Sequence, residues 1–396
     1  MKRPRTLAGC RGAGRNGGRE TGLTPDSSSP PSPLLAHVVY ALCGHGRGHS
    51  SRARAVAEAL RPRGHRVSFA ADAPAADRLA GEGDVYRVPG LRQVLHGNRV
   101  RMGATARANL DLTWRSPEII SDAARWLERV GADVVVADHE PFVGRAAKRA
   151  GVPVVALSHQ LVLTESRPRT RLRDLPAALG TTLGIGVLSP PRPDAAVVPS
   201  FFFPPARPRS TAVFVPPILR DDVLAARPRA GRRLLVYVNE GAGMGPLLDA
   251  LAGAGVPADV YGLDPSIGAP PGVRLRAPSR PGFLADLAAC RAVVATAGFT
   301  LLSEALHLGK PVLALPNRGF FEQTVNALAL REQGRGDAVL GRALRPDDLR
   351  GFLDRADAYR QRGASDGTVG RERAADVIER VLGRSARVTG PLAEAA

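Results

Sequence analysis

The chain has 396 residues and a mass of 41.7 kDa, which is too long for one ordinary domain and suits two of about 100–200 residues each. Hydrophobic residues make up 44% and charged residues 23%, an average globular composition that excludes disorder throughout. No apolar run reaches the roughly 18–20 residues that a membrane-spanning helix needs. The net charge of +18 favours anionic partners without choosing among phosphates, nucleic acid and acidic lipid.

Cysteine usage and the N-terminus predict a cytoplasmic protein. Cys10, Cys43 and Cys290 are too far apart for a disulfide framework or a metal-ligand pattern, and the basic N-terminus lacks the apolar core of a signal peptide. We expect no metal site and no cofactor, and peripheral contact with the inner face of a membrane stays open. The arginines are spread along the chain rather than gathered beside aromatic residues, which argues against a dedicated nucleic-acid partner.

A disordered basic tail is predicted at residues 1–33, which contain six basic and two acidic residues and many Gly, Pro and Ser. From residue 34 onward, strands and helices alternate. Apolar runs predict strands at 34–43, 65–70, 132–137 and 152–157, and helical spacing predicts helices at 53–60, 122–130 and 143–150. Ser50 and Ser51 are predicted to cap the first of these helices.

A proline-rich stretch at 204–217 and a basic stretch at 227–233 mark a domain boundary. A second series follows, with strands at 233–238, 258–261, 292–295 and 312–315 and helices at 245–254, 282–290 and 301–308. The predicted organisation is an N-terminal domain at 34–218, a linker at 219–232, a C-terminal domain at 233–346, helices at 347–385 and a disordered tail at 386–396. The predicted fold is α/β, with two Rossmann-like doubly wound parallel sheets facing a cleft that holds the ligand.

The first candidate site is the glycine-rich segment Gly44–His49 after the first strand. Gly46 and Gly48 let a ligand approach the backbone, and the helix that follows offers free N–H groups. His49 begins this helix, where the dipole favours the neutral imidazole that a general base needs, and His45 is the second candidate. The pattern is only partly dinucleotide-like, because its third glycine is displaced and no acidic residue closes the predicted second strand. A tight turn with surface histidines is the alternative.

The second candidate site follows the strand at 132–137. Asp138 is placed to orient His49 and stabilise its protonated form, and Glu140 is assigned to the acceptor side. The alternative is that Asp138 simply caps the helix that begins near residue 142.

The third candidate site is the segment 296–327. Gly298, Phe299 and Thr300 precede a helix, with Thr300 as its cap, so the N–H groups there suit a diphosphate. Glu304 lies one turn further, on the face that suits ribose hydroxyls. Glu322 and Gln323 follow the next strand and are placed to bind sugar hydroxyls. Lys310 is predicted to be a surface turn residue, because no P-loop pattern surrounds it.

With these motifs, the sequence resembles GT-B-fold glycosyltransferases. It is similar to glycosyltransferase family 28 through AGFTLLSEALHLGKPVLALPNRGFFEQTVNA, and to a branch of uncharacterised glycosyltransferases through GHGxGHxxR. The resemblance covers about residues 36–345. It implies an acceptor side in the first domain, a nucleotide-sugar side in the second, and metal-independent transfer with inversion.

By the same resemblance, Gly298–Thr300 would bind the diphosphate, Glu304 the ribose, and Glu322 and Gln323 the donor sugar, while His49 would lie near the acceptor. The glycine turn with Gly241 and Gly243 would lie near the phosphates, and the base would lie against the segment 280–283 with Phe283. Arg52 stands where the family usually has proline, so acceptor chemistry does not carry over.

The predicted function is therefore hexosyl transfer from a nucleotide-diphosphate sugar, UDP first and dTDP or GDP next, to an unknown hydroxyl acceptor. A non-hydrolysing nucleotide-sugar 2-epimerase and a basic nucleic-acid or membrane-surface binder are the alternatives. Two weaker features bear on the acceptor. The arginines of the loop 167–173 suit an anionic acceptor such as a phospholipid carrier, or are simply solvated, and Phe201–Phe203 form a membrane patch or are buried.

Overall fold

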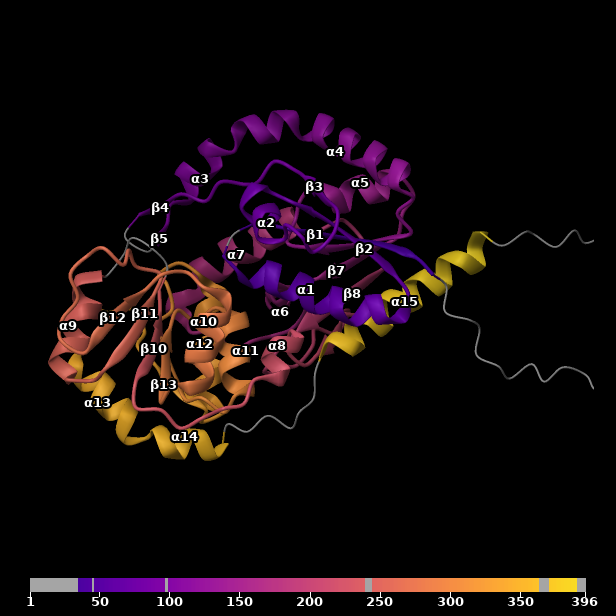
Figure 1. Ribbon diagram of the computed structural model, residues 1–396. Coiled ribbons are helices and arrows are strands. Elements are labelled where there is room, and N and C mark those ends of the chain that lie inside the picture. Colours follow the sequence, from indigo (N-terminus) through magenta and orange to yellow (C-terminus); the bar gives the residue numbers. More distant parts are fainter. Residues whose placement is uncertain (1–34, 45, 97–98, 239–243, 363–369, 390–396) are drawn as a thin grey trace, which may run out of the picture. The chain divides into compact units, whose positions relative to one another are not determined.

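The computed structural model describes residues 35–396 except 45, 97–98, 239–243, 363–369 and 390–396 (Figure 1). Two parallel sheets organise this part of the chain, which confirms the predicted α/β class. The first sheet has seven strands in the order β3-β2-β1-β6-β7-β8-β9. Its strands are β1 (His37–Leu42), β2 (Arg66–Ala71), β3 (Val85–Arg87), β6 (Val134–Asp138), β7 (Val154–Leu157), β8 (Ala195–Pro199) and β9 (Val213–Val215).

The second sheet has six strands in the order β12-β11-β10-β13-β14-β15. They are β10 (Leu234–Tyr237), β11 (Ala258–Tyr261), β12 (Val273–Arg276), β13 (Ala292–Ala295), β14 (Val312–Ala314) and β15 (Gly336–Ala338). All adjacent strands in both sheets run parallel, and β4 (Leu95–His96) pairs antiparallel with β5 (Arg99–Val100) apart from them.

Helices connect the strands of each sheet. Along the first sheet they are α1 (Gly48–Leu60), α2 (Ala73–Arg78), α3 (Met102–Ala108), α4 (Leu110–Val130), α5 (Val143–Arg149), α6 (Val162–Glu165) and α7 (Leu175–Leu188). Those that follow are α8 (Asp221–Ala225), α9 (Met244–Ala254), α10 (Arg280–Ala289), α11 (Phe299–His307), α12 (Phe321–Glu332), α13 (Pro346–Asp354), α14 (Ala356–Arg362) and α15 (Gly370–Thr389). Three short 3-10 helices occur at Arg61–Arg63, His159–Leu161 and Leu172–Asp174. None of the helices in the described residues is both long and apolar enough to cross a bilayer.

The strand order reverses once in each sheet, at the point where ligands of doubly wound folds bind. In the first sheet β1 lies between β2 and β6, and its last residue, Leu42, is in register with Asp138. In the second sheet β10 lies between β11 and β13. The glycine segment after β1 and the segment before α11 therefore each start beside such a reversal.

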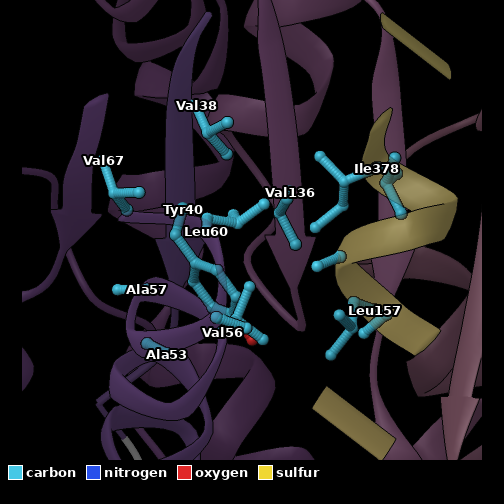
Figure 2. Close-up of a cluster of buried hydrophobic side chains, with 14 of the residues drawn as sticks. Val38, Tyr40, Ala53, Val56, Ala57, Leu60, Val67, Val136, Leu157 and Ile378 are labelled. Carbon is cyan, nitrogen blue, oxygen red and sulfur yellow. The ribbon is translucent and has the colours of Figure 1, made fainter. Parts of the chain in front are cut away.

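The C-terminal helix α15 packs on the first sheet rather than the second. Its Ile378 shares a buried cluster with Val56 and Leu60 of α1 and with Val136 of β6 (Figure 2). Apolar side chains of α13 and α15 are buried: Leu349, Leu353, Val377, Ile378 and Val381. Arg63, beyond α1, adds ion pairs to carboxylates along α15. The helix continues to Thr389, past residue 385, where the C-terminal helices were predicted to end.

Several local predictions were wrong for physical reasons. Helix α1 begins at Gly48, so Ser50 and Ser51 lie inside the helix and do not cap it. Lys310 is buried rather than in a surface turn, and its Nζ donates to the carbonyl oxygens of Arg229 (2.7 Å) and Cys290 (2.9 Å). A lysine can be buried at this position because backbone oxygens replace its hydration.

Candidate active site

The first group of site residues gathers around Asp138, at the end of β6. This carboxylate is fully buried. The Nδ1 of His49 lies 2.9 Å from its Oδ1, and Arg52 donates from Nη2 to Oδ1 (2.7 Å) and from Nε to Oδ2 (2.9 Å). The Tyr40 hydroxyl also donates to Oδ2, at 2.9 Å. Asp138 therefore joins β1, α1 and β6 through four hydrogen bonds and does not act as a helix cap.

Neighbouring charges set the protonation states of Asp138 and His49. Burial raises the pKa of Asp138, but the Arg52 guanidinium and His49 outweigh burial and hold the pKa well below its usual range, so Asp138 is ionised. Burial lowers the pKa of His49, but Cys43 and the Asp138 carboxylate outweigh it and raise the pKa above its usual range. The expected neutral imidazole at the start of α1 is therefore disfavoured in this structure, because a buried carboxylate in contact outweighs the partial charge of a helix end.

The Nδ1 of His49 lies 2.9 Å from Asp138 Oδ1 and also 2.9 Å from Arg52 Nη2, so both contacts orient the ring through Nδ1. The imidazole side chain is 12% exposed and lies parallel to the ring of His139 at 6.1 Å between centroids. His139 has a φ of 58°, an uncommon conformation for a non-glycine residue that turns the chain sharply after β6. His49 is thus a partly exposed histidine held in a single orientation.

The glycine segment before α1 is fixed by Asp72. Its carboxylate accepts from the Gly44 N–H (2.9 Å) and from the Ala75 N–H at the start of α2 (3.2 Å). The prediction that no acidic residue closes the second strand was wrong, because β2 continues to Ala71 and Asp72 follows it directly. Gly46 has a φ of 72°, which favours glycine. His45 lies outside the described residues.

The N-terminal ends of α1 and α11 meet. A Cβ at Gly48 would lie 2.6 Å from Thr300 Oγ1, so a larger residue there would require the Thr300 side chain to shift. Gly298 rather than Thr300 is the N-cap residue of α11, because the helix already starts at Phe299. The N–H groups of Phe299 and Thr300 donate to no acceptor within the described residues, as expected for the first turn of a helix.

Glu304, one turn into α11, is buried between three segments of the chain. Its Oε1 accepts from Ser51 Oγ of α1 (3.3 Å) and from Arg220 Nη2 ahead of α8 (3.1 Å). Burial raises the pKa of Glu304, and the Arg220 guanidinium partly offsets that rise. Glu304, the residue predicted to bind the ribose, therefore already has one carboxylate oxygen in an ion pair.

The remaining predicted donor residues have different surroundings. Gln323 accepts from the Asn317 N–H through Oε1 (2.8 Å), whereas Glu322 is half-buried in the first turn of α12 and 3.4 Å from Asn326 Nδ2. The charge of Glu322 is one of several that raise the pKa of Arg52. Phe283 packs edge-on against Tyr237 and Tyr261. Gly241 and Gly243 lie outside the described residues.

Glu140, assigned to the acceptor side, serves the start of α5 in this structure. Its two oxygens accept from the N–H groups of Phe142 (3.0 Å) and Val143 (2.6 Å). Burial raises its pKa to about 7, against the lowering effect of these two N–H groups. Both carboxylate oxygens are thus occupied by backbone.

Sequence reasoning missed three residues of the site. Arg52 lies three positions after His49, a helical spacing that places both on one face of α1 and offered a signal. His159 stacks on Phe299 with centroids 3.9 Å apart, and its Nε2 is 2.8 Å from Asn326 Oδ1. Arg220 is distant in sequence from Glu304, and no local pattern reveals that pair.

Solved structures share this architecture, and a glycosyltransferase of unknown activity is similar in sequence. The crystal structure of Acinetobacter baumannii MurG is 16% identical, covers 87% of this chain and 99% of its own, and superposes with a TM-score of 0.58. The glycosyltransferase VinC in complex with dTDP is 18% identical, covers 88% of this chain and all of its own, with a TM-score of 0.55. An uncharacterised glycosyltransferase of Methanosarcina acetivorans is 24% identical over 340 residues, 76% of this chain and 84% of its own.

The two parallel sheets and these structural neighbours define a GT-B glycosyltransferase fold, as the motifs predicted. The sequence also matches the profile of glycosyl transferase family 1 over residues 36–356. The chain belongs to this family and is a glycosyltransferase.

Proposed function

We propose that this glycosyltransferase takes its sugar from a nucleoside-diphosphate donor held at α11 and transfers it to a hydroxyl acceptor beside His49. The observation that carries the proposal is the meeting of the two helix ends, where Gly48 lies against Thr300. Free N–H groups at the start of α11 suit a diphosphate, and the buried carboxylate of Glu304 lies one turn beyond. The complex of VinC with dTDP supports a nucleoside diphosphate as the donor's leaving group.

In this proposal His49 is the general base. Its Nε2 accepts the proton of the acceptor hydroxyl, and Asp138 stabilises the imidazolium that forms. The acceptor oxygen then attacks the anomeric carbon as the bond to the diphosphate breaks, so the configuration inverts. The N–H groups of Phe299 and Thr300 stabilise the charge that develops on the diphosphate.

We also propose that transfer needs no metal ion. Helix N–H groups supply electrostatic stabilisation at the place where other enzymes use a divalent cation. Asp221 and Asp222, the adjacent acidic pair in the linker, begin α8, and Asp222 accepts from Arg220 and Arg280. Both of its ion pairs are therefore with arginines.

Thermal unfolding with added nucleotides, and incubation with a nucleotide sugar, test the proposed function. We expect UDP or dTDP to raise the unfolding midpoint of the full chain, because a ligand that binds only the folded state stabilises it, with or without EDTA. UDP-GlcNAc incubated alone should stay unchanged. Formation of UDP-ManNAc without an acceptor would identify a 2-epimerase instead, and salt-sensitive duplex DNA binding with no nucleotide response would identify a nucleic-acid binder.

We further propose that the protein contacts anionic membranes through α7. In the aromatic patch considered from the sequence, Phe201 and Phe202 are buried and Phe203 is exposed. Helix α7 instead has no charged residue and exposes one apolar stripe: Leu175, Leu179, Leu183 and Val187. Arg169 and Arg171, ahead of this helix, and Arg331 of α12 line a pocket of about 470 Å³ that Glu332 also lines. An apolar helix face beside arginines is complementary to a bilayer that carries acidic headgroups.

Vesicle flotation tests this surface. Full-length protein is expected to float with phosphatidylglycerol vesicles and not with phosphatidylcholine vesicles. Leu179→Gln with Leu183→Gln should weaken binding about tenfold or more, because each buried CH₂ adds about 0.8 kcal/mol. Trp114→Gln, an exposed site on α4, is the matched control and should have no effect. Equal binding to both lipids, or a leucine variant that changes only the oligomeric state, would contradict the proposal.

A further inference from the structure

Glu304 is held asymmetrically. Both of its hydrogen bonds, from Ser51 and from Arg220, end on Oε1. Its Oε2 accepts none from the described residues and is not fully enclosed, although the side chain as a whole is only 8% exposed. One oxygen is therefore used to fix the carboxylate, and the other is left available to a ligand.

The two donors to Oε1 come from outside the second sheet. Ser51 is on α1, two residues from His49, and Arg220 is in the segment ahead of α8. Arg220 is itself buried and held by Asp222, at 2.9 Å between Nη1 and Oδ2. Asp222 also accepts from Arg280 at the start of α10 (3.0 Å). A chain of ion pairs thus sets the position of Glu304.

We propose that Arg220 and Ser51 are positioning residues for the donor: they hold the Glu304 carboxylate so that Oε2 accepts the ribose hydroxyls of the bound nucleotide. This inference rests on the proposed function. It also gives α1 two roles, since His49 faces the acceptor while Ser51 fixes the carboxylate that binds the donor.

Charge makes the arrangement testable. Burial raises the pKa of Glu304, Arg220 lowers it and Asp222 raises it; Arg280 pairs with Asp222, and Arg54 and Glu82 lie beside Arg280. A carboxylate with a raised pKa loses its charge as pH falls through that pKa, and nucleotide affinity falls with it. Without the Arg220 charge the pKa rises further, so the loss of affinity must move to higher pH.

Isothermal titration of the full chain with UDP and dTDP from pH 5.5 to 8.5 measures this shift. Arg220→Met is expected to weaken binding about tenfold at pH 7 and to move the loss to higher pH. Arg220→Lys, which keeps the charge, should restore most of the affinity. Ser51→Ala should weaken nucleotide binding about threefold, less than Arg220→Met, because it removes one long hydrogen bond (3.3 Å) and no charge. Adding Arg220→Met to Glu304→Gln should change little, because the titrating partner is already gone.

The outcomes separate the two levels of the proposal. If the parent binds neither nucleotide, the proposed function fails. If Glu304→Gln weakens binding while Arg220→Met leaves both the affinity and the pH profile unchanged, the positioning role alone is wrong. A uniform loss of affinity with an unshifted profile also overturns it, since that is the result of a merely structural residue. Should Arg220→Met fail to fold, Ser51→Ala decides: a threefold loss of nucleotide affinity supports the positioning role, and an affinity equal to the parent's overturns it.

Discussion

Replacing Glu304 with alanine is expected to lower the affinity for the donor nucleotide at least about a hundredfold, and turnover with it. Hydrogen bonds from ribose hydroxyls to a carboxylate contribute about 1.5–3 kcal/mol each, and α11 has no second acidic residue to replace them. Titration calorimetry with UDP or dTDP measures the loss. Glu304→Gln should bind better than Glu304→Ala but remain well below the parent.

A control separates this effect from stability. Removing Glu304 leaves the buried Arg220 without one of its carboxylates, which destabilises the fold, so unfolding midpoints must be measured for each variant. Asp347→Ala, at an exposed carboxylate of the same half of the chain, should leave nucleotide binding unchanged. Full affinity in a folded Glu304→Ala protein would remove Glu304 from the donor site.

Replacing His49 with alanine is expected to lower kcat about 10²–10⁴-fold, the usual contribution of a general base, while the nucleotide binds as before. A His49 whose pKa is raised is protonated at neutral pH and cannot accept a proton. The value of kcat/KM should therefore rise with pH above 7. Asp138→Asn removes the negative charge that stabilises the imidazolium. The rise of kcat/KM should therefore move to lower pH, and the maximal rate should also fall.

His307→Ala is the matched control for His49, because it removes an imidazole at the opposite end of α11. It should change neither kcat nor the pH profile. A His49→Ala enzyme with the parent's kcat would assign the base to another residue. If kcat/KM of Asp138→Asn rises at the same pH as that of the parent, the titrating group is not the pair formed by His49 and Asp138.

The sequence predicted the parallel strands well, because strands buried on both faces are short apolar runs that end at glycine or polar residues. The strands at 258–261 and 292–295 have the predicted bounds. Helix α7 escaped prediction because its sequence is apolar on all sides and lacks helical periodicity. Helix α4 was predicted only from residue 122, since its first half around Trp114 is exposed.

The site was predictable in part for a similar reason. His49 and Asp138 follow neighbouring strands, and the carboxyl ends of parallel strands meet at one sheet edge, so their approach follows from the strand order. Arg220 reaches Glu304 across 84 positions of the chain, and Lys310 is buried because two distant carbonyl oxygens happen to face it. Such pairs depend on how elements pack, which local patterns do not contain.

A structure of the chain with UDP or dTDP bound would show whether α11 holds the donor. We expect the diphosphate at the N–H groups of Phe299 and Thr300, and the ribose hydroxyls on Oε2 of Glu304, with Arg220 still on Oε1. A nucleotide bound elsewhere, or a ribose that makes no contact with Glu304, would contradict this expectation.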